Sequence, residues 1–480
     1  NPEGFKRLRE AYETAVSWAR QPEPLEEGEK TDIEKWIDQV NEIYLDIHDR
    51  CNPKLWIDVL EDPVCTDLDT SLQAREGMMA YLMDHIYLPN VIWKLLDECF
   101  QIVEERELLE QQFPTDFLNY VMYYIRNTEF INYYLFEILD RDSMDADAYI
   151  RNFLGIKRLI DQGQVRECKE KLEQLEAFGI YHPYEDVEML RVLYTLMEQA
   201  KEELPETMTL EETAGGKEAV RLIEALLEKY EEDCYIKLHC GVAKWTLGQK
   251  EEANQLWEQI LIHQPSHYMA KFYTIRYLME KEEYKQAKER MLELLDMDAN
   301  DEQVIEYLHT ANDALIKEYE TKLNEEGEES ERFENAMELA RCFYQNDKPE
   351  DAVPLLDGLV PDEKQEYDYV NLFGRILYRA DEYEKACPNL KRWLELIRQT
   401  PEEDEEYENR KNREFRACHI LSGCCHEMGD RKQAMKYVEE AIRVALNQED
   451  TVSAMQYKAY MLFTYEEYEN CVDVCDQVIR

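Results

Sequence analysis

Five Cys and His residues within nine positions could in principle bind a metal ion. They are Cys418, His419, Cys424, Cys425 and His426. A zinc site would need such ligands within about 2.0–2.3 Å of one ion. The residues are expected on a single helix, where Cys418 and Cys425, like His419 and His426, lie two turns or roughly 10 Å apart. We therefore expect no metal site unless other segments supply ligands, and packing of small thiols between helices is the competing interpretation.

Motifs for nucleotide binding and for nucleophilic catalysis are weak. Gly215-Gly216-Lys217 lies in an acidic loop with no strand before it, so it does not resemble a phosphate-binding loop. No Ser or Cys has the elbow context that a nucleophile paired with His would need. With 106 acidic residues in the chain, neighbouring carboxylates say nothing about acid–base catalysis. We expect no catalysed reaction and no cofactor.

The charge of the chain restricts its partners. The net charge of −51 repels phosphate backbones and anionic membranes, so we expect no nucleic acid and no membrane partner. No run approaches eighteen apolar residues, as a membrane-spanning helix would require. The 13 Cys are scattered and odd in number, which favours free buried thiols and a cytoplasmic location.

The periodicity of apolar residues predicts helices throughout. Gly and Pro are scarce, at 15 each, which disfavours a fold of strands and hairpins. After an acidic linker at 21–30, helices are expected from Thr31 and at 53–60, 67–84, 89–111 and 114–140, with boundaries marked by Pro63, Pro89 and Pro114. This stretch is rich in Trp and Tyr. Helical spacing favours a core role, with an exposed binding patch as the alternative.

From about residue 149 onward a small residue recurs at one place in a helix that follows a turn. The spacing is 34 residues in two runs, and the turn glycines Gly163, Gly248 and Gly429 each lie five residues earlier. Small residues allow two antiparallel helices to approach closely, and a large apolar residue one turn later fills the next groove. The recurring positions are Cys168, Ala219, Ala253, Ala287, Ala352, Ala386, Ala434 and Cys471.

This pattern resembles the tetratricopeptide repeat, whose period is 34 residues, over about 149–480. The unit around Ala253 fits best, with Gly241 before it and Trp257 and Pro265 after it. The match departs from the family in several ways. Every unit lacks the early Trp, 65 residues separate Ala287 from Ala352, and an acidic stretch is inserted at 400–413. The resemblance implies an α–α superhelix.

In the tetratricopeptide family the first helix of each pair lines a concave groove. A basic residue at its ninth position and an aromatic or Met residue at its twelfth would form a row along that groove. Such a row could hold an acidic or carboxylate-ended peptide, because guanidinium groups bind carboxylates bidentately and stack on rings. The alternative is that these cations neutralise neighbouring acids. The ninth positions are Lys157, Arg276, Arg341 and Arg375, and the twelfth are Trp245, Met279, Tyr344 and Tyr378.

The first twenty residues carry a second resemblance. Phe5, Leu8 and Ala11-Tyr12-Glu13 are similar to the last long helix of a J domain, with an ordinary amphipathic helix as the alternative. The chain begins at Asn1 rather than Met, and we expect it to be a fragment. The resemblance implies that the His-Pro-Asp signature of the family would lie before Asn1. The resemblance implies a co-chaperone that recruits a DnaK-type chaperone.

Together these patterns predict an all-α protein with four parts. They are the tail helix of a J-like domain at 1–20, a linker at 21–30, an N-terminal helical bundle at 31–148 and tetratricopeptide-like repeats at 149–480. The expected function is binding of proteins or peptides, as the client- or partner-binding part of a J-domain co-chaperone. The alternatives are an assembly scaffold with no chaperone link and a helical-repeat enzyme such as a transferase.

Overall fold

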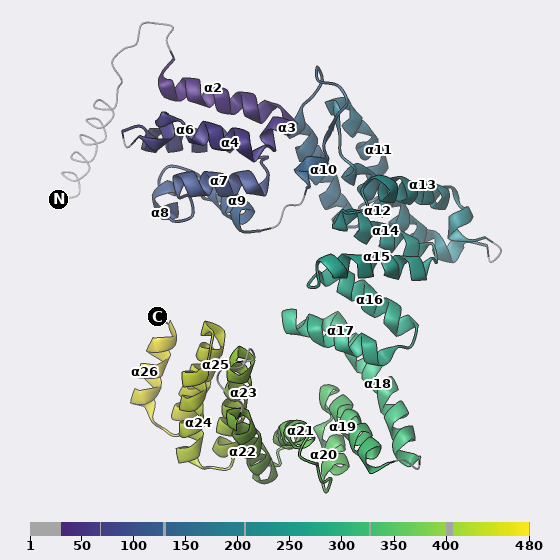
Figure 1. Ribbon diagram of the computed structural model, residues 1–480, viewed down its shortest axis with the longest axis vertical. Helices are drawn as coiled ribbons and strands as arrows, with labels where there is room; N and C mark the ends of the chain where they lie inside the picture. The colour runs from purple at the N-terminus through teal and green to yellow at the C-terminus, as the bar shows by residue number, and fades with distance from the viewer. Residues whose placement is uncertain are drawn as a thin grey trace. The chain divides into compact units, whose positions relative to one another are not determined.

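The computed structural model confirms an all-α fold, with one short β-ribbon (Figure 1). It describes residues 30–67, 69–127, 131–205, 208–325, 328–399 and 407–479. The expected helix at 1–20 and nearly all of the linker at 21–30 lie outside these residues. The chain forms two compact units, of which unit 1 ends at Leu256 and unit 2 begins at Trp257, within helix α15 (Lys250–His263).

Unit 1 begins with a bundle of short helices around a core rich in tryptophan. Trp36, Trp56 and Trp93 are almost completely buried, and Trp36 Nε1 donates to the carbonyl of Val59 at 2.9 Å. The tryptophans of this stretch are therefore core, Tyr81, Tyr120 and Tyr124 pack partly buried against it, and Tyr123 and Tyr134 are exposed. The helices are α2 (Asp32–Leu45), α3 (Ile47–Arg50), α4 (Pro53–Leu60), α5 (Pro63–Thr66), α6 (Ser71–Asp84), α7 (Asn90–Phe100), α8 (Arg106–Leu109) and α9 (Thr115–Arg126).

Two of the expected helices are wrong in length. The helix expected at 89–111 is interrupted after Phe100, because Gln101 adopts the left-handed conformation with φ 53°. The helix expected at 114–140 ends at Arg126, and β1 (Glu137–Ile138) lies beyond it. This strand pairs antiparallel with β2 (Ile180–Tyr181), so residues 149–480 are not wholly helical. Cross-strand pairing over such a distance leaves no local signal in the chain.

The remainder of unit 1 consists of helix pairs that share one apolar core. Gly216 lies at the start of one of these helices, and a Cβ there would lie 2.0 Å from the carbonyl oxygen of Leu210. Gly216 therefore serves close packing. The elements are η1 (Tyr133–Leu135), α10 (Ala146–Asp161), α11 (Cys168–Glu173), η2 (Gln174–Phe178), α12 (Tyr184–Ala200), η3 (Lys201–Glu203), η4 (Leu210–Glu212), α13 (Ala214–Lys229) and α14 (Cys234–Thr246), with the first part of α15.

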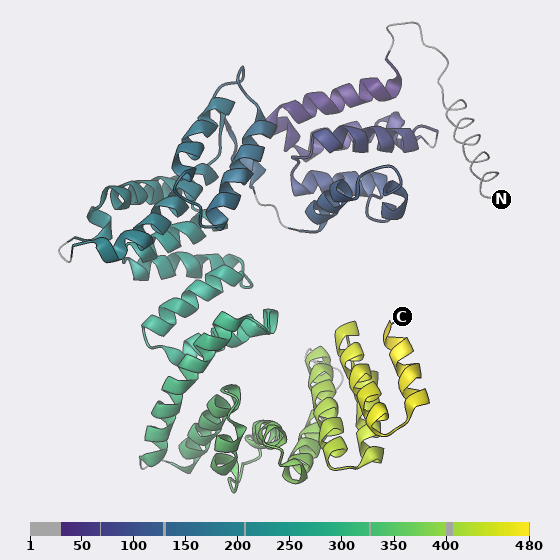
Figure 2. The same cartoon turned by 180° about the vertical axis from the view of Figure 1, so that it is seen from behind.

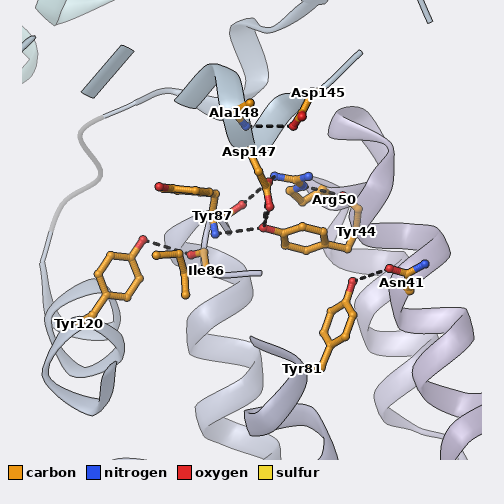
Figure 3. Close-up of polar contacts among 10 residues, drawn as sticks. All are labelled: Asn41, Tyr44, Arg50, Tyr81, Ile86, Tyr87, Tyr120, Asp145, Asp147 and Ala148. Carbon is orange, nitrogen blue, oxygen red and sulfur yellow. Dashed lines mark hydrogen bonds and ion pairs between the residues drawn. The ribbon is translucent and has the colours of Figure 1, made fainter. Parts of the chain in front are cut away.

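A buried ion pair joins the bundle to the first helix pair (Figure 3). Arg50 is 2% exposed, and its Nη1 donates to Asp147 Oδ1 of α10 at 2.8 Å. The Tyr44 hydroxyl donates to the same carboxylate at 2.9 Å, and the guanidinium lies 3.8 Å from the Tyr44 ring centroid. Burial raises the pKa of Tyr44, which keeps this hydroxyl a neutral donor. The position of the bundle against α10 thus depends on a charge pair whose guanidinium is buried and whose carboxylate is partly exposed.

Unit 2 continues with antiparallel helix pairs, seen from behind in Figure 2. The long α18 lies between two regular pairs and contacts α17 and α19, which accounts for the spacing of 65 residues between Ala287 and Ala352. The helices are α16 (Tyr268–Glu280), α17 (Tyr284–Met297), α18 (Glu302–Asn324), α19 (Glu329–Gln345), α20 (Pro349–Leu356), α21 (Glu366–Arg379), α22 (Tyr383–Gln399), α23 (Tyr407–Glu427), α24 (Arg431–Val444), α25 (Gln448–Thr464) and α26 (Tyr468–Ile479).

Within the described residues, seven helix pairs have the same turn, five residues before the recurring small residue. At each turn one residue is left-handed, and the next N–H reaches back to the carbonyl five residues before it, as Gln249 does to Lys244 at 2.9 Å. Six of the eight recurring small residues are alanines, and all six are fully buried. The repeat is thus confirmed as tetratricopeptide-like in its local geometry. The left-handed residues are Gly163, Gly248, Glu282, Asp347, Asp381, Gly429 and Glu466.

Candidate functional site

Helices α21, α22 and α23 of unit 2 enclose a hollow of about 760 Å³, which we call the arginine pocket. Helix α21 contributes side chains one turn apart on one face, α23 does the same, and the indole of Trp393 on α22 forms part of the wall. Ten residues line it: Tyr367, Asp368, Asn371, Arg375, Trp393, Arg413, Phe415, Arg416, His419 and Ile420.

Close helix packing sets the shape of the pocket. A Cβ on Gly374 would lie 2.9 Å from Leu390 Cδ2 and 3.3 Å from the Leu390 backbone nitrogen, so α21 and α22 approach here more closely than any larger residue allows. Gly374 stands twelve residues before Ala386, which is completely buried at the same helix crossing. This crossing places Arg375, the next residue, at the side of the pocket.

The pocket is basic within a strongly acidic chain. Arg375 and Arg416 form no ion pair with any other described residue, whereas many cations elsewhere in the structure do. The Arg375 guanidinium lies 5.2 Å from the ring centroid of Tyr344 on α19, which orients it. Asp368, exposed at the edge, is the one acid among the lining residues. The site is therefore complementary to an anionic group.

Four buried polar atoms, one on each of four residues that line the pocket, have no hydrogen-bond partner among the described residues. They are Trp393 Nε1, Tyr367 Oη, Asn371 Oδ1 and His419 Nδ1. Trp393 is only 3% exposed, so its unpaired N–H is costly unless a ligand accepts it. Burial lowers the pKa of His419, so its ring is neutral near pH 7 and can accept or donate. Unpaired donors and acceptors thus belong to residues that line one hollow. A second hollow, of about 840 Å³ beside α10 and α11 in unit 1, has no such unpaired atom in its lining.

The expected groove residues of unit 2 are brought together only in part. Arg375 and Tyr344 are in contact, as the row requires, and Tyr378 packs against Tyr383 at 5.7 Å. Arg341 instead pairs with Glu338 at 3.2 Å on its own helix. On α16 the Arg276 guanidinium lies 6.0 Å from the Tyr273 ring centroid, outside the arginine pocket.

The two expected residues of unit 1 have different surroundings. Lys157 pairs with the fully buried Glu188 at 3.3 Å, and Glu188 also accepts from Tyr235 at 2.5 Å and from Arg191 at 2.8 Å. Trp245 lies under the Lys250 ammonium, with 5.2 Å between the nitrogen and the ring centroid. The Lys157 network is a closed set of charge-assisted hydrogen bonds inside unit 1.

Sequence reasoning missed most of the pocket. Arg413 is the last residue of the inserted acidic stretch that breaks the 34-residue register, Arg416 and His419 follow it, and Trp393 lies on the second helix of a pair. The spacing of Arg413, Arg416 and Ile420 at intervals of three and four would have placed them on one helical face. Nothing in the chain indicates that this face meets Arg375.

The Cys residues of the α23 group lie in the core, whereas His419 lines the arginine pocket. Cys418, Cys424 and Cys425 are buried in the core, where Cys424 and Cys425 lie beside Cys387 of α22. No group of three or more possible ligands is suitably placed for a metal ion anywhere in the described ranges. All 13 cysteines are free thiols. Of the helices that can be described, none is long and apolar enough to cross a bilayer.

Comparison with known proteins adds one family match. The family described as DjlB/C second domain matches residues 34–128, which form the bundle α2 to α9. No curated protein matches the chain. One similar solved structure is YrrB, described as a TPR protein with an unusual peptide-binding site, at 16% identity over 49% of this chain and 97% of that chain, with a TM-score of 0.23.

Two further solved structures are similar. One is a tetratricopeptide repeat protein from Parabacteroides merdae, at 11% identity over 65% of this chain and 98% of that chain, with a TM-score of 0.27. The other is the C-terminal part of a TPR repeat-containing protein from Cytophaga hutchinsonii, at 16% identity over 60% and 93%, with a TM-score of 0.25. At TM-scores of 0.23 to 0.27 these structures do not match the chain as a whole. The seven equivalent turns of the described residues, six of them followed by a buried small residue, identify the helix pairs as tetratricopeptide-like.

Proposed function

We propose that this chain binds proteins or peptides on the face of unit 2 that contains the arginine pocket, and that the pocket receives a carboxylate at the end of the ligand. The observation that carries the proposal is one hollow lined by Arg375 and Arg416, which form no ion pair with another described residue, and by Trp393, whose buried N–H is unpaired, in a chain of net charge −51. An anion is the ligand that satisfies both features. We propose no reaction for it.

The lining residues supply positive charge, a hydrogen-bond donor and a hydrogen-bond acceptor to the ligand. Arg375 and Arg416 supply guanidinium groups that match the two oxygens of a carboxylate. Trp393 Nε1 donates from a buried position, where a hydrogen bond is not weakened by competing water. Asn371 Oδ1 is an acceptor suited to a peptide N–H next to the terminal carboxylate.

The test uses a fluorescein-labelled synthetic dodecapeptide with a free carboxyl terminus and the same peptide with a terminal amide. Fluorescence anisotropy with the whole chain should give an affinity for the acid at least tenfold above that for the amide, because a charge-assisted hydrogen bond contributes about 1.5–3 kcal/mol. Arg375→Gln and Trp393→Phe should each reduce this ratio. The second removes one N–H and keeps an aromatic ring in the wall.

A matched control is Arg332→Gln, because Arg332 is an exposed arginine of α19 outside the pocket. It changes the net charge as Arg375→Gln does and should leave both affinities unchanged. Equal affinities of acid and amide peptides for the unmodified chain would disprove the carboxylate site. A loss of affinity in Arg332→Gln equal to that in Arg375→Gln would reduce the effect to general electrostatics.

We also propose that the protein is a co-chaperone of a DnaK-type chaperone, with its repeats selecting the client or partner. Two features support this link. Residues 5–13 resemble the last helix of a J domain, and the bundle that follows matches the DjlB/C second domain, a name that points to a DnaJ-related protein. The order of J-like helix, bundle and repeats is that of a chaperone-recruiting part followed by a partner-binding part.

The co-chaperone proposal is tested on the full-length protein. The coding sequence ahead of Asn1 is read for His-Pro-Asp, and ATP hydrolysis by a DnaK-type chaperone is then measured with and without the protein. We expect stimulation that disappears when this His is replaced by Gln. If His-Pro-Asp is absent or hydrolysis is unchanged, the assembly-scaffold interpretation of the repeats stands instead.

A further inference from the structure

Aromatic side chains continue from the arginine pocket along α23 and onto α25. We call Tyr378, His419, His426, Tyr457 and Tyr460 the tyrosine–histidine shelf. His419 belongs to both sites, because it lines the pocket and its ring lies 5.3 Å from that of Tyr457. Tyr457 and Tyr460 are one turn apart on α25, with centroids 6.0 Å apart and planes within 29° of parallel. The shelf is therefore continuous with the wall of the pocket.

Two contacts hold the shelf in shape. His426 meets Tyr460 edge-on, with centroids 5.7 Å apart, and its Nδ1 lies 2.8 Å from the Tyr465 hydroxyl, which fixes the ring. A Cβ on Gly423 would lie 2.5 Å from the Tyr378 hydroxyl oxygen. Glycine costs about 1 kcal/mol relative to alanine inside a helix. At Gly423 this cost is offset, because the absent side chain lets the Tyr378 ring lie across the α23 backbone.

The shelf presents an exposed aromatic ring and two hydroxyl groups that could bind a ligand. Tyr460 is 53% exposed, a large value for an aromatic side chain within a row of ring contacts. The hydroxyl groups of Tyr457 and Tyr460 have no hydrogen-bond partner among the described residues. Near-parallel aromatic rings with free hydroxyl donors are the features by which proteins recognise extended, proline-containing segments: the rings pack on the pyrrolidines and the donors meet backbone carbonyls.

We propose that the shelf binds a proline-containing segment of the ligand, directly ahead of the carboxylate held in the arginine pocket. This rests on the proposed function and names the class of its ligand, a peptide with prolines close to its free carboxyl terminus. A polyproline II chain rises about 3.1 Å per residue. The ring steps of 5.3 and 6.0 Å from His419 to Tyr457 and on to Tyr460 each correspond to about two residues. The prolines are therefore placed about two to five residues before the end.

The charges around the shelf favour this ligand over a purely acidic one. Burial is the main cause that raises the pKa of both Tyr378 and Tyr457, and the charge of Glu427 adds to the rise, so an acid lies beside the shelf. An acidic segment placed there would be repelled, whereas prolines carry no charge. The single anion of the ligand is then its terminal carboxylate, which the arginines receive.

The experiment compares four fluorescein-labelled dodecapeptides. Their third to fifth residues from the end are either prolines or alanines, and each sequence is made with a free carboxylate and with an amide. For the unmodified chain the proline acid should bind about tenfold more tightly than the alanine acid, as expected for one well-packed aromatic contact. Tyr460→Ala should remove this preference while the difference between acid and amide persists. Tyr457→Phe, which removes only a hydroxyl, should reduce the preference in part.

Phe463→Ala is the matched control, because Phe463 is 60% exposed on the same helix and touches Tyr468 instead of the shelf. It should leave all four affinities unchanged, and circular dichroism should show that each variant is as helical as the parent. Equal affinities of the proline and alanine acids would overturn the shelf and leave the pocket intact. A proline preference without any difference between acid and amide would instead refute the pocket and support the shelf.

Discussion

Removing the carboxylate of Asp147 should weaken unit 1 more than any change at an exposed ion pair. Asp147→Ala leaves the Arg50 guanidinium, 2% exposed, without its charged partner, and the Tyr44 hydroxyl without an acceptor. Breaking a buried pair in this way costs about 3–5 kcal/mol. We expect the lower end of this range, because Asp147 is 20% exposed and Arg50 keeps two backbone carbonyls, those of Tyr44 and Tyr87.

The assay is urea denaturation followed by tryptophan fluorescence. The indole of Trp56 donates to the carbonyl of Arg50 at 3.0 Å, so the probe lies at the junction itself. Arg50→Met, alone and together with Asp147→Ala, completes a double-mutant cycle, in which the cost of the Asp147 change should fall by at least about 1.5 kcal/mol. As a control, Glu382→Ala breaks the exposed pair with Lys385 and should cost under about 1 kcal/mol. A cost below about 1 kcal/mol for Asp147→Ala would refute the reasoning.

Three further predictions concern stability. Burial raises the pKa of Glu185 to about 7, so the folded protein binds more protons at this residue than the unfolded chain does between pH 4.5 and 7. The protonated carboxyl therefore contributes to the free energy of unfolding fully below pH 4.5, and the contribution is lost as the pH rises to 7. Glu185→Gln should make the free energy of unfolding less dependent on pH in this range, as measured by urea titrations at several pH values. Glu282→Gly should stabilise unit 2 by up to about 1 kcal/mol in urea denaturation, because Glu282 has φ 60°; a loss of stability would contradict this. Gly374→Ala should lower the thermal midpoint because its methyl group meets Leu390, whereas Gly155→Ala, with open space around it, should raise it; equal shifts would show that packing at Gly374 is not limiting.

The tetratricopeptide-like repeat could be predicted because its signals are local. A small residue such as Ala253 or Ala352 recurs wherever two helices cross, and Gly248 marks a turn that needs a left-handed residue. The equivalent turns at Glu282 and Asp347 carried no such signal. Their side chains tolerate the strain because the helices on either side are packed in place, which is a tertiary effect.

The candidate site could be predicted only in part. Arg375 and Tyr344 were expected beside each other in a row along the groove of stacked units, and the Arg375 guanidinium lies 5.2 Å from the Tyr344 ring centroid. The register failed after the acidic insertion at 400–413, so Arg416 was not placed beside Arg375. The role of Trp393 could not be anticipated at all, because an unpaired buried N–H becomes visible only once its surroundings are known.

The amino-acid sequence by itself determined that the chain is helical, that its helices pair with small residues at their crossings, and that its surface carries strong negative charge. Each of these follows from the composition or from contacts between residues close in the chain. Tertiary structure alone decided that Glu137–Ile138 pairs with Ile180–Tyr181, that Arg50 is buried against Asp147, and that arginines from two helices share one pocket. These contacts join distant segments, and their free energy depends on burial and mutual geometry, which no local pattern encodes.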